Sequence, residues 1–319
     1  MKTPRLIQIA PDEPQALRAE LLAGLTAPTA TIAPKYLYDA LGSRLFAAIV
    51  ELPEYYPTRI ETAIFARHIG AIAQALGPVA TLVDLGAGNC EKAARLFDAF
   101  QVQRYVAVDI SASYLRESLE NLQRRHPALD MLGIGLDFSE NLSLPTEAGA
   151  GARTLFYPGS SIGNFTPGEA LGFLRQSHAA SQGGALLIGV DLVKPIDILE
   201  SAYDDALGVT AAFNRNMLLH MNRLVGTDFD VADWRHVAFL NVADSRIEMH
   251  LEARRDVTAS WPDGARRFAA GERIHTENSC KWRIDDFAAL LRLAGFSRLQ
   301  HWTDEREWFA VFLAFCGGG

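Results

Sequence analysis

The sequence has few cysteines and no long apolar run, and each absence excludes a class of protein. Its three cysteines, Cys90, Cys280 and Cys316, include no CxxC pair, so they suit neither a disulfide framework nor a zinc site. We therefore expect a reducing compartment, the cytoplasm. No stretch reaches the ~18 apolar residues of a membrane span. The first residues meet acids and prolines before any apolar run, unlike a secretory signal peptide.

Acidic residues outnumber basic ones, and the basic residues are scattered along the sequence. The formal net charge is −8, from 30 Lys and Arg against 38 Asp and Glu, and arginine pairs such as Arg124-Arg125 stand alone. Because nucleic-acid binding needs a basic patch or stripe, we expect no nucleic-acid partner, and no membrane partner. We expect instead a small-molecule substrate and a monomeric chain. With 319 residues, 49% of them hydrophobic, the chain can bury a full core, in about two domains.

Apolar runs alternate with helical patterns in the middle of the chain, which predicts a parallel sheet flanked by helices. A helical pattern at 284–296 and two strand-like runs within 297–315 then predict a closing antiparallel hairpin. The predicted fold class is α/β: a doubly wound, Rossmann-like sheet with a C-terminal antiparallel hairpin and an inserted lobe. The apolar runs are 81–88, 104–111, 131–138, 154–161 and 185–193.

The alternation stops after residue 194 and returns at residue 282. Between them lie a helical pattern at 210–225 and an apparent hairpin at 237–255. We therefore expect a discontinuous core, residues 62–194 and 282–319, and a substrate-binding lobe, residues 1–61 and 195–281.

A glycine turn follows the first of these strands. In Val83-Asp84-Leu85-Gly86-Ala87-Gly88 the missing Cβ atoms let the backbone approach a ligand closely. Asp109 and the pair Asp137-Phe138 end the next two strands, so a doubly wound sheet brings them to the same edge. Asp109 can accept hydrogen bonds from both hydroxyls of a ribose. Asp137 can accept one from the amino group of an adenine, and Phe138 can cover the edge of its ring. The alternatives are a turn without a ligand and acids that cap helices.

A nicotinamide-dinucleotide site is the rival interpretation of this turn. Its GxGxxG fingerprint requires a third glycine and places a pyrophosphate at the helix N-terminus. Position 91 is Glu, whose carboxylate would repel a pyrophosphate. S-adenosylmethionine carries no phosphate, and the sequence favours it as the cofactor.

Sequence blocks along nearly the whole chain resemble one family. In chain order they are LYDALGSRLF, ELPEYYPTR, DLGAGNCEK, YPGSSIGNF, DLVKP, YDDALGVTAAFNRNML, IEMHL and HTENSCKW. Together they resemble the histidine N-α-methyltransferases of ergothioneine biosynthesis. The resemblance implies a class I methyltransferase fold and transfer of methyl groups from S-adenosylmethionine to the α-amino group of L-histidine, with trimethylhistidine (hercynine) as product.

The resemblance also implies site residues. The cofactor would be held by Tyr56, Gly86, Lys92, Asp109, Asp137 and Phe138. The substrate would be held by Tyr38, Asn164, Tyr203, Met249, Glu277 and Ser279. Tyr38 is the candidate catalytic residue, as acceptor of the amine proton, and no metal is expected.

These residues match the chemistry of free histidine. Asn164 and Tyr203 can donate to its carboxylate, Glu277 can accept an imidazole N–H, and Ser279 can engage the other ring nitrogen. Taken singly, each has an ordinary alternative. Tyr203-Asp204-Asp205 is also typical of an exposed acidic turn, Glu277-Asn278-Ser279 of a helix cap, Met249 of a core residue and Lys92 of a solvated helix residue.

Other functions stay open at this point. Within the same scaffold, the substrate could be another aromatic amino acid, such as a tryptophan derivative. Outside it, the chain could be a non-catalytic S-adenosylmethionine-binding domain or the dehydrogenase weighed above. His220, His250 and His275 lie apart without metal-ligand spacing and are expected to be ordinary histidines.

Overall fold

The computed structural model describes residues 2–9, 14–139 and 141–317, which form two compact units. Unit 1 comprises Met1–Pro11, Arg59–Val193 and Trp282–Gly319, and unit 2 comprises Asp12–Thr58 and Lys194–Lys281. This division differs from the expected one at the N-terminus. The strand β1 (Arg5–Gln8) pairs in parallel with β5 (Asp130–Gly135), so it extends the sheet of unit 1 instead of joining unit 2.

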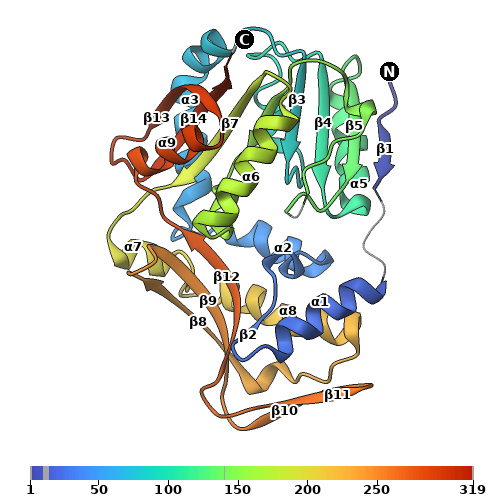
Figure 1. Ribbon diagram of the computed structural model, residues 1–319, viewed down its shortest axis with the longest axis vertical. Helices are drawn as coiled ribbons and strands as arrows, with labels where there is room; N and C mark the ends of the chain where they lie inside the picture. Colours follow the sequence, from blue (N-terminus) through green and yellow to red (C-terminus); the bar gives the residue numbers. More distant parts are fainter. Residues whose placement is uncertain (1, 10–13, 140, 318–319) are drawn as a thin grey trace. The chain divides into compact units, whose positions relative to one another are not determined.

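Unit 1 contains one sheet, and its strand order is β1-β5-β4-β3-β6-β7-β14-β13 within the described residues. The chain leaves β3 toward β4 and β5 on one side and toward β6 and β7 on the other, with parallel pairing throughout (Figure 1). The last two strands are antiparallel. The doubly wound sheet with its closing hairpin, the class I methyltransferase fold, is confirmed. The other strands are β3 (Thr81–Leu85), β4 (Arg104–Asp109), β6 (Thr154–Tyr157), β7 (Ala185–Asp191), β13 (Phe296–Thr303) and β14 (Phe309–Cys316).

Helices cover both faces of this sheet. On one face, Leu115 and Leu119 pack with Tyr105 and Met131 in a core that also takes Ile64. On the other face, Phe173 contacts Tyr157, and Phe287 contacts Phe312, with ring centroids 4.8 and 5.2 Å apart. The helices that supply these side chains are α3 (Tyr56–Leu76) and α5 (Ala112–Arg125) on the first face, and α6 (Pro167–Ala180) and α9 (Ile284–Leu293) on the second.

The helix expected after the glycine turn is much shorter than its pattern indicates. Only α4 (Glu91–Ala94) is helical. The chain then continues in turns in which Leu96 N–H donates to Ala93 and Phe97 N–H to Ala94. Because Leu96, Phe97 and Phe100 are all buried, the apolar spacing there reflects packing of a tight coil.

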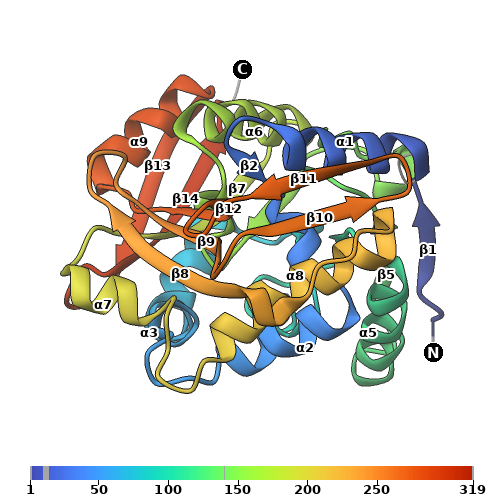
Figure 2. The same ribbon diagram turned by 90° about the horizontal axis from the view of Figure 1, so that it is seen from below.

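Unit 2 is built around a second sheet with strand order β2-β12-β9-β8. The long helix α8 packs on it through Phe213, Met217 and Met221, which join Met249 and Leu251 in one apolar core. A separate antiparallel hairpin, β10–β11, extends from this sheet (Figure 2). The elements are α1 (Pro14–Thr26), β2 (Ala30–Thr31), α2 (Ala40–Ile49), α7 (Ile196–Ser201), α8 (Val209–Val225), β8 (Trp234–Asn241), β9 (Arg246–Ala253), β10 (Val257–Trp261), β11 (Gly264–Phe268) and β12 (Arg273–Cys280). The predicted helix and hairpin of the lobe correspond to α8 and to β8–β9.

In the ranges that the structure describes, no helix combines the length and the apolar character that crossing a membrane would require.

One acid lies inside the sheet of unit 1. Asp84, on β3, is buried and accepts a hydrogen bond of 2.7 Å from the Tyr105 hydroxyl on β4. Burial raises the pKa of Asp84 from its ordinary 3.8 to about 7, against the hydrogen bond from Tyr105, which lowers it. The folded chain therefore binds a proton at Asp84 that the unfolded chain has already released above about pH 4.

This proton gives a testable pH dependence. Because the folded-state pKa is raised, the stability contributed by neutral Asp84 is complete below pH 3.8 and is lost as the pH rises through about 7. We expect Asp84→Asn, which keeps an acceptor for Tyr105, to gain thermal stability relative to the wild type between pH 5 and pH 8. Calorimetric melting of both proteins across this range is the measurement. A stability difference that stays constant with pH would contradict the assignment.

Candidate functional site

The glycine turn after β3 is held in left-handed backbone. Gly86, Gly88 and Cys90 have φ angles of 73°, 52° and 63°, and the N–H groups of Gly86 and Ala87 both donate to the Val108 carbonyl on the next strand. A Cβ added at Gly86 would lie 3.7 Å from the Phe138 ring. That distance is ordinary van der Waals contact, so the positive φ angle, and not crowding, is what favours glycine at this position.

Asp109, the last residue of β4, is tied to this turn. Its carboxylate accepts one N–H from Gly88 and one from Ser111, both at 2.9 Å. Burial raises its pKa, and the backbone N–H groups of Ser111 and Gly88 oppose that rise. Asp109 is therefore not merely a helix cap, and each of its oxygens has a second lone pair for a hydroxyl donor.

Asp137 and Phe138 follow β5, the next strand of the sheet. Asp137 accepts hydrogen bonds from the backbone N–H and the hydroxyl of Ser139. The Phe138 ring meets Tyr157 edge to face, with centroids 5.9 Å apart. Since β3, β4 and β5 are parallel neighbours, the three predicted segments do reach the same edge of the sheet, where such folds bind ligands.

Lys92 is not the solvated helix residue of the alternative interpretation. Its ammonium forms a 2.8 Å ion pair with Glu61 of α3, whose side chain is only 2% exposed. The other oxygen of Glu61 accepts the Gly159 N–H at 2.7 Å. Glu61 thus connects the start of α4 to the loop that follows β6.

Sequence reasoning missed Glu61. On β7, a Cβ at Gly189 would lie 2.1 Å from a Glu61 oxygen, so the carboxylate occupies the space of the absent side chain. The one available signal was an acid beside apolar residues of the α3 pattern, such as Ile60 and Ile64, which is common on helices.

The argument from Glu91 against a dinucleotide is weaker in the structure than in the sequence. Its carboxylate is paired with Arg125 by two hydrogen bonds, of 2.5 and 3.2 Å, so little net charge remains to repel a phosphate. What fits S-adenosylmethionine is the set of groups at this edge of the sheet: carboxylates at Asp109 and Asp137, and the Phe138 ring close to Gly86.

In unit 2, three predicted substrate residues share one face of the sheet. Glu277 of β12 lies opposite Met249 of β9, and Ser279 lies opposite Ile247. Glu277 and Ser279 are 7% and 5% exposed, and Met249 is 1% exposed. They belong to a strand, so the interpretation of Glu277-Asn278-Ser279 as a helix cap was wrong. Met249 does lie in the core, and it lines the same face as the two polar residues.

Tyr203 completes this group, together with a residue that the sequence did not indicate. The Tyr203 hydroxyl lies 2.6 Å from the Ser279 hydroxyl. The ammonium of Lys281 donates to both, at 3.1 and 2.7 Å, and lies 4.7 Å from the centre of the Tyr203 ring. Lys281 follows β12 directly, and only the fold shows that its side chain returns to this cluster.

The segment after Tyr203 is not an exposed acidic turn. Asp205 is 5% exposed, and its carboxylate accepts the N–H groups of Val209 and Thr210 at 2.9 and 2.7 Å. It therefore caps the first turn of α8. Although burial opposes it, these N–H groups lower the pKa of Asp205. The cap fixes the loop from which Tyr203 projects.

The remaining predicted residues lie in different surroundings. Tyr38 packs edge to face against Phe46 and Phe213, both with centroids 5.5 Å away. Tyr56 receives a 3.0 Å hydrogen bond from Lys194, whose ammonium also lies 4.4 Å from its ring centre. Asn164, at the end of a 3-10 turn over Ser161–Asn164, belongs to unit 1.

Comparisons with known proteins give consistent matches. A sequence model of the family described as "Histidine-specific methyltransferase, SAM-dependent" matches residues 17–316. The chain is 41% identical to the histidine N-alpha-methyltransferase of Mycolicibacterium smegmatis over 307 residues, 94% of this chain and 95% of that protein. It is 42% identical to the protein of the same name from Mycobacterium tuberculosis, over 94% of each chain.

A third relative is larger. Ergothioneine biosynthesis protein 1 of Neurospora crassa is 28% identical over 292 residues, which are 87% of this chain and 32% of that protein.

The Glu61 bridge gives a prediction for cofactor binding. In Glu61→Gln, the amide can accept from Lys92 or from Gly159, but its NH₂ group then faces the other donor. We expect S-adenosylhomocysteine to bind ~10-fold more weakly, a loss of ~1.4 kcal/mol, in isothermal titration calorimetry.

Glu305→Gln is the matched control, because Glu305 pairs with Arg67 at 2.9 Å but is 83% exposed. Such a surface pair contributes little. Equal affinities for the two variants would contradict the bridging role of Glu61.

Proposed function

The chain belongs to the family of histidine-specific, S-adenosylmethionine-dependent methyltransferases, and from this premise we propose how its residues direct three methyl groups to one nitrogen. Its reaction is the S-adenosylmethionine-dependent methylation of histidine in ergothioneine biosynthesis. It is an enzyme, so the non-catalytic binding domain and the dehydrogenase are excluded. The product that we propose is Nα,Nα,Nα-trimethylhistidine, hercynine.

One observation supports the substrate assignment most strongly. In unit 2, the buried side chains of Glu277 and Ser279 line the same face as Met249, and the half-buried Tyr203 hydroxyl meets Ser279 there. With the ammonium of Lys281, this carboxylate and these two hydroxyls offer a ligand both hydrogen-bond acceptors and donors. A free amino acid with an imidazole side chain supplies matching polar groups.

We assign the imidazole to Glu277 and Ser279. The Glu277 carboxylate would accept one ring N–H, while the Ser279 hydroxyl would engage the other ring nitrogen. Because both lie on β12 with a single residue between them, their spacing is fixed by the strand. An analogue without these ring nitrogens would leave both partners unpaired, at a cost of roughly 10⁴-fold in specificity.

The carboxylate of the substrate is assigned to Tyr203. Lys281 donates to the oxygens of Tyr203 and Ser279, and one of these hydroxyls donates to the other, which leaves one hydroxyl proton for an acceptor outside the cluster. The ammonium also places a positive charge beside an anionic ligand. Asn164 as a second donor, and Tyr56 as a cofactor contact, are predictions supported by the resemblance alone.

Methyl transfer needs little covalent chemistry from the protein. When bound, S-adenosylmethionine supplies the methyl group on a sulfonium, an electrophile that an uncharged amine attacks in line. The residues of the chain then have to align the amine and exclude water. Tyr38, set against Phe46 and Phe213, is proposed to accept the amine proton while its own hydroxyl proton passes to a water molecule.

Repeated transfer converts the amine into a quaternary ammonium, which aromatic faces stabilise. The Lys194 ammonium already lies over the ring of Tyr56. Tyr38 is therefore a better candidate for this contact than Tyr56. An aromatic wall that tolerates a permanent cation allows the reaction to proceed to three methyl groups.

We further propose a monomer acting in the cytoplasm. All three cysteines lie in the described part of the chain, are buried and form no disulfide, which supports a reducing compartment. Analytical ultracentrifugation of the purified chain tests the oligomeric state.

The first prediction from this proposal concerns the product. Incubation with excess S-adenosylmethionine and L-histidine is expected to give mainly the trimethylated amino acid, because the unprotonated mono- and dimethylated amines each keep a lone pair that can attack the methyl donor. Mass spectrometry with isotope-labelled methyl donor measures the number of methyl groups. Accumulation of a monomethylated product would refute the third transfer.

The second prediction concerns specificity. Glu277→Ala is expected to lower kcat/KM for histidine by at least ~100-fold, because an imidazole N–H loses its acceptor, and to raise tryptophan turnover relative to histidine turnover. Steady-state kinetics with both amino acids make the comparison, and Glu120→Ala on the exposed side of α5 is the control. Unchanged histidine kinetics in Glu277→Ala would remove the imidazole assignment without affecting the family assignment.

A further inference from the structure

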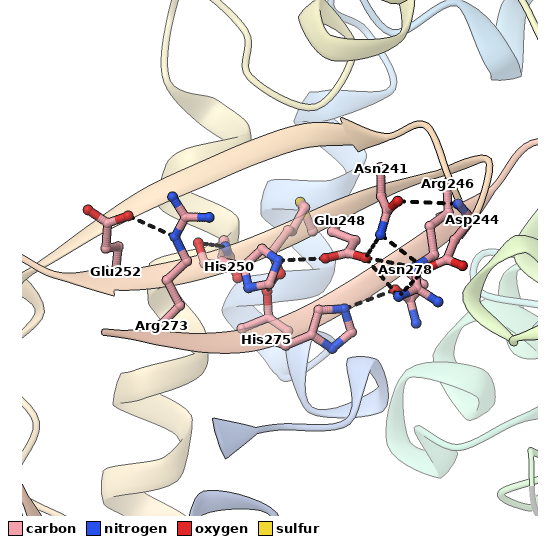
Figure 3. A network of polar contacts seen from close by, with 12 residues as sticks. Asn241, Asp244, Arg246, Glu248, His250, Glu252, Arg273, His275 and Asn278 are labelled. Atoms are coloured by element: carbon pink, nitrogen blue, oxygen red, sulfur yellow. Dashed lines mark hydrogen bonds and ion pairs between the residues drawn. The ribbon is translucent and has the colours of Figure 1, made fainter. Parts of the chain in front are cut away.

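The opposite face of the unit 2 sheet carries a polar cluster that methyl transfer does not use. Along β9, Glu248 and His250 alternate with the core residues Met249 and Leu251 and therefore point away from them. His275 of β12 lies opposite His250 in the strand register. Figure 3 shows Glu248, His250 and His275 turned toward one another.

A β-bulge in β12 creates this arrangement. The register shifts between His275 and Glu277, because Thr276 is an extra residue that donates its hydroxyl proton to the Met249 carbonyl at 3.0 Å. Without the bulge, His275 and Glu277 would point to the same face. With it, His275 joins His250 on the outer face, while Glu277 faces the substrate residues.

The three side chains offer a compact set of metal ligands. One nitrogen from each histidine and one oxygen of Glu248 all lie within 4.8 Å of one another. The Glu248 oxygen already lies 3.0 Å from Nε2 of His250. Two imidazole nitrogens and one carboxylate oxygen are a ligand set typical of Zn²⁺ in proteins, with the fourth position left for water or another oxygen.

Surrounding residues hold these ligands in place. The second oxygen of Glu248 accepts hydrogen bonds from Asn241, at 2.9 Å, and from Arg246, at 2.8 Å, so the first oxygen remains directed at His250. Phe239 stacks on the His250 ring with an interplanar angle of 8°. Nε2 of His275 lies 2.9 Å from Oδ1 of Asn278, an oxygen at the edge of the cluster. Outer contacts of this kind orient metal ligands.

The arginines near the cluster are paired with acids. Arg246 pairs with Asp244 as well as Glu248. Arg273 and Arg235 both pair with Glu252. The three guanidinium groups are thus matched in number by three carboxylates, Glu248 included.

The protonation states agree with this geometry. Burial lowers the pKa of His250 and of His275, which favours the neutral imidazole that binds metals. Burial opposes ionisation of Glu248, but hydrogen bonds from Asn241, Arg246 and His250 outweigh it and lower the pKa to about 2.

We propose that Glu248, His250 and His275 bind one divalent transition-metal ion, with Zn²⁺ as the expected ion, and that it joins β9 to β12 behind the substrate residues. On binding, the Nε2 proton of His250 is released or moves to Nδ1, and the metal bond replaces the hydrogen bond to Glu248. The site stands apart from the methyl-transfer residues and does not depend on their assignment.

Metal content of the untagged, chelator-treated chain tests the proposal directly. After equilibrium dialysis against Zn²⁺ without substrate, the wild type is expected to retain one ion per chain by inductively coupled plasma mass spectrometry. His250→Ala and His275→Ala are each expected to bind ~100-fold more weakly or worse. His301→Ala, which removes an exposed histidine of β13, is the matched control and is expected to bind as the wild type does.

A second measurement needs no variant, in case a histidine substitution impairs folding. Co²⁺ in a four-coordinate site of two imidazoles and a carboxylate gives strong visible absorption, whereas six-coordinate Co²⁺ at surface groups gives weak bands. We expect the strong spectrum from the wild-type chain, together with a Zn²⁺-dependent rise in melting temperature. No retained ion, a six-coordinate spectrum, or equal binding by folded His250→Ala and His275→Ala would overturn the proposal.

Discussion

One extra residue in one strand separates the two chemical faces of unit 2. Thr276 is accommodated by a bulge in β12 and by its hydrogen bond to the Met249 carbonyl. It places Glu277 with Met249 on one side and His275 with His250 on the other. A regular strand would point His275 and Glu277 to the same face, so the separation of the proposed substrate residues from the histidine pair follows from this irregularity.

In unit 1, a buried charged side chain, and not a backbone irregularity, holds separate segments together. Glu61 holds the ammonium of Lys92 with one oxygen and the Gly159 N–H with the other. Two loops that follow different strands of the sheet are thereby joined by one buried carboxylate. Together with the Asp109 bonds to Gly88 and Ser111, this bridge fixes the positions of residues that we propose to bind the cofactor, and fixed positions lower the entropy cost of binding.

The sequence predicted the parts of this protein that regular periodicity determines. The alternating apolar runs were enough to predict the doubly wound sheet. The ends of these runs were enough to place Asp109, Asp137 and Phe138 at one edge of it. It did not predict Glu61 or Lys281, because their roles depend on which elements pack against each other. Neither the bulge at Thr276 nor the pairing of Glu91 with Arg125 has a local signal. The substrate residues came from the resemblance, since singly each had an ordinary alternative.

The close approach of Glu61 to Gly189 restricts which residues related chains can carry at these positions. The Glu61 carboxylate fills the volume where any larger residue on β7 would place its Cβ. In related chains, a side chain at position 189 is therefore compatible only with a shorter residue at position 61, which in turn leaves the lysine at position 92 without its acid. These three positions should change together or not at all, and such covariation would mark the bridge even in distant relatives whose overall identity is low.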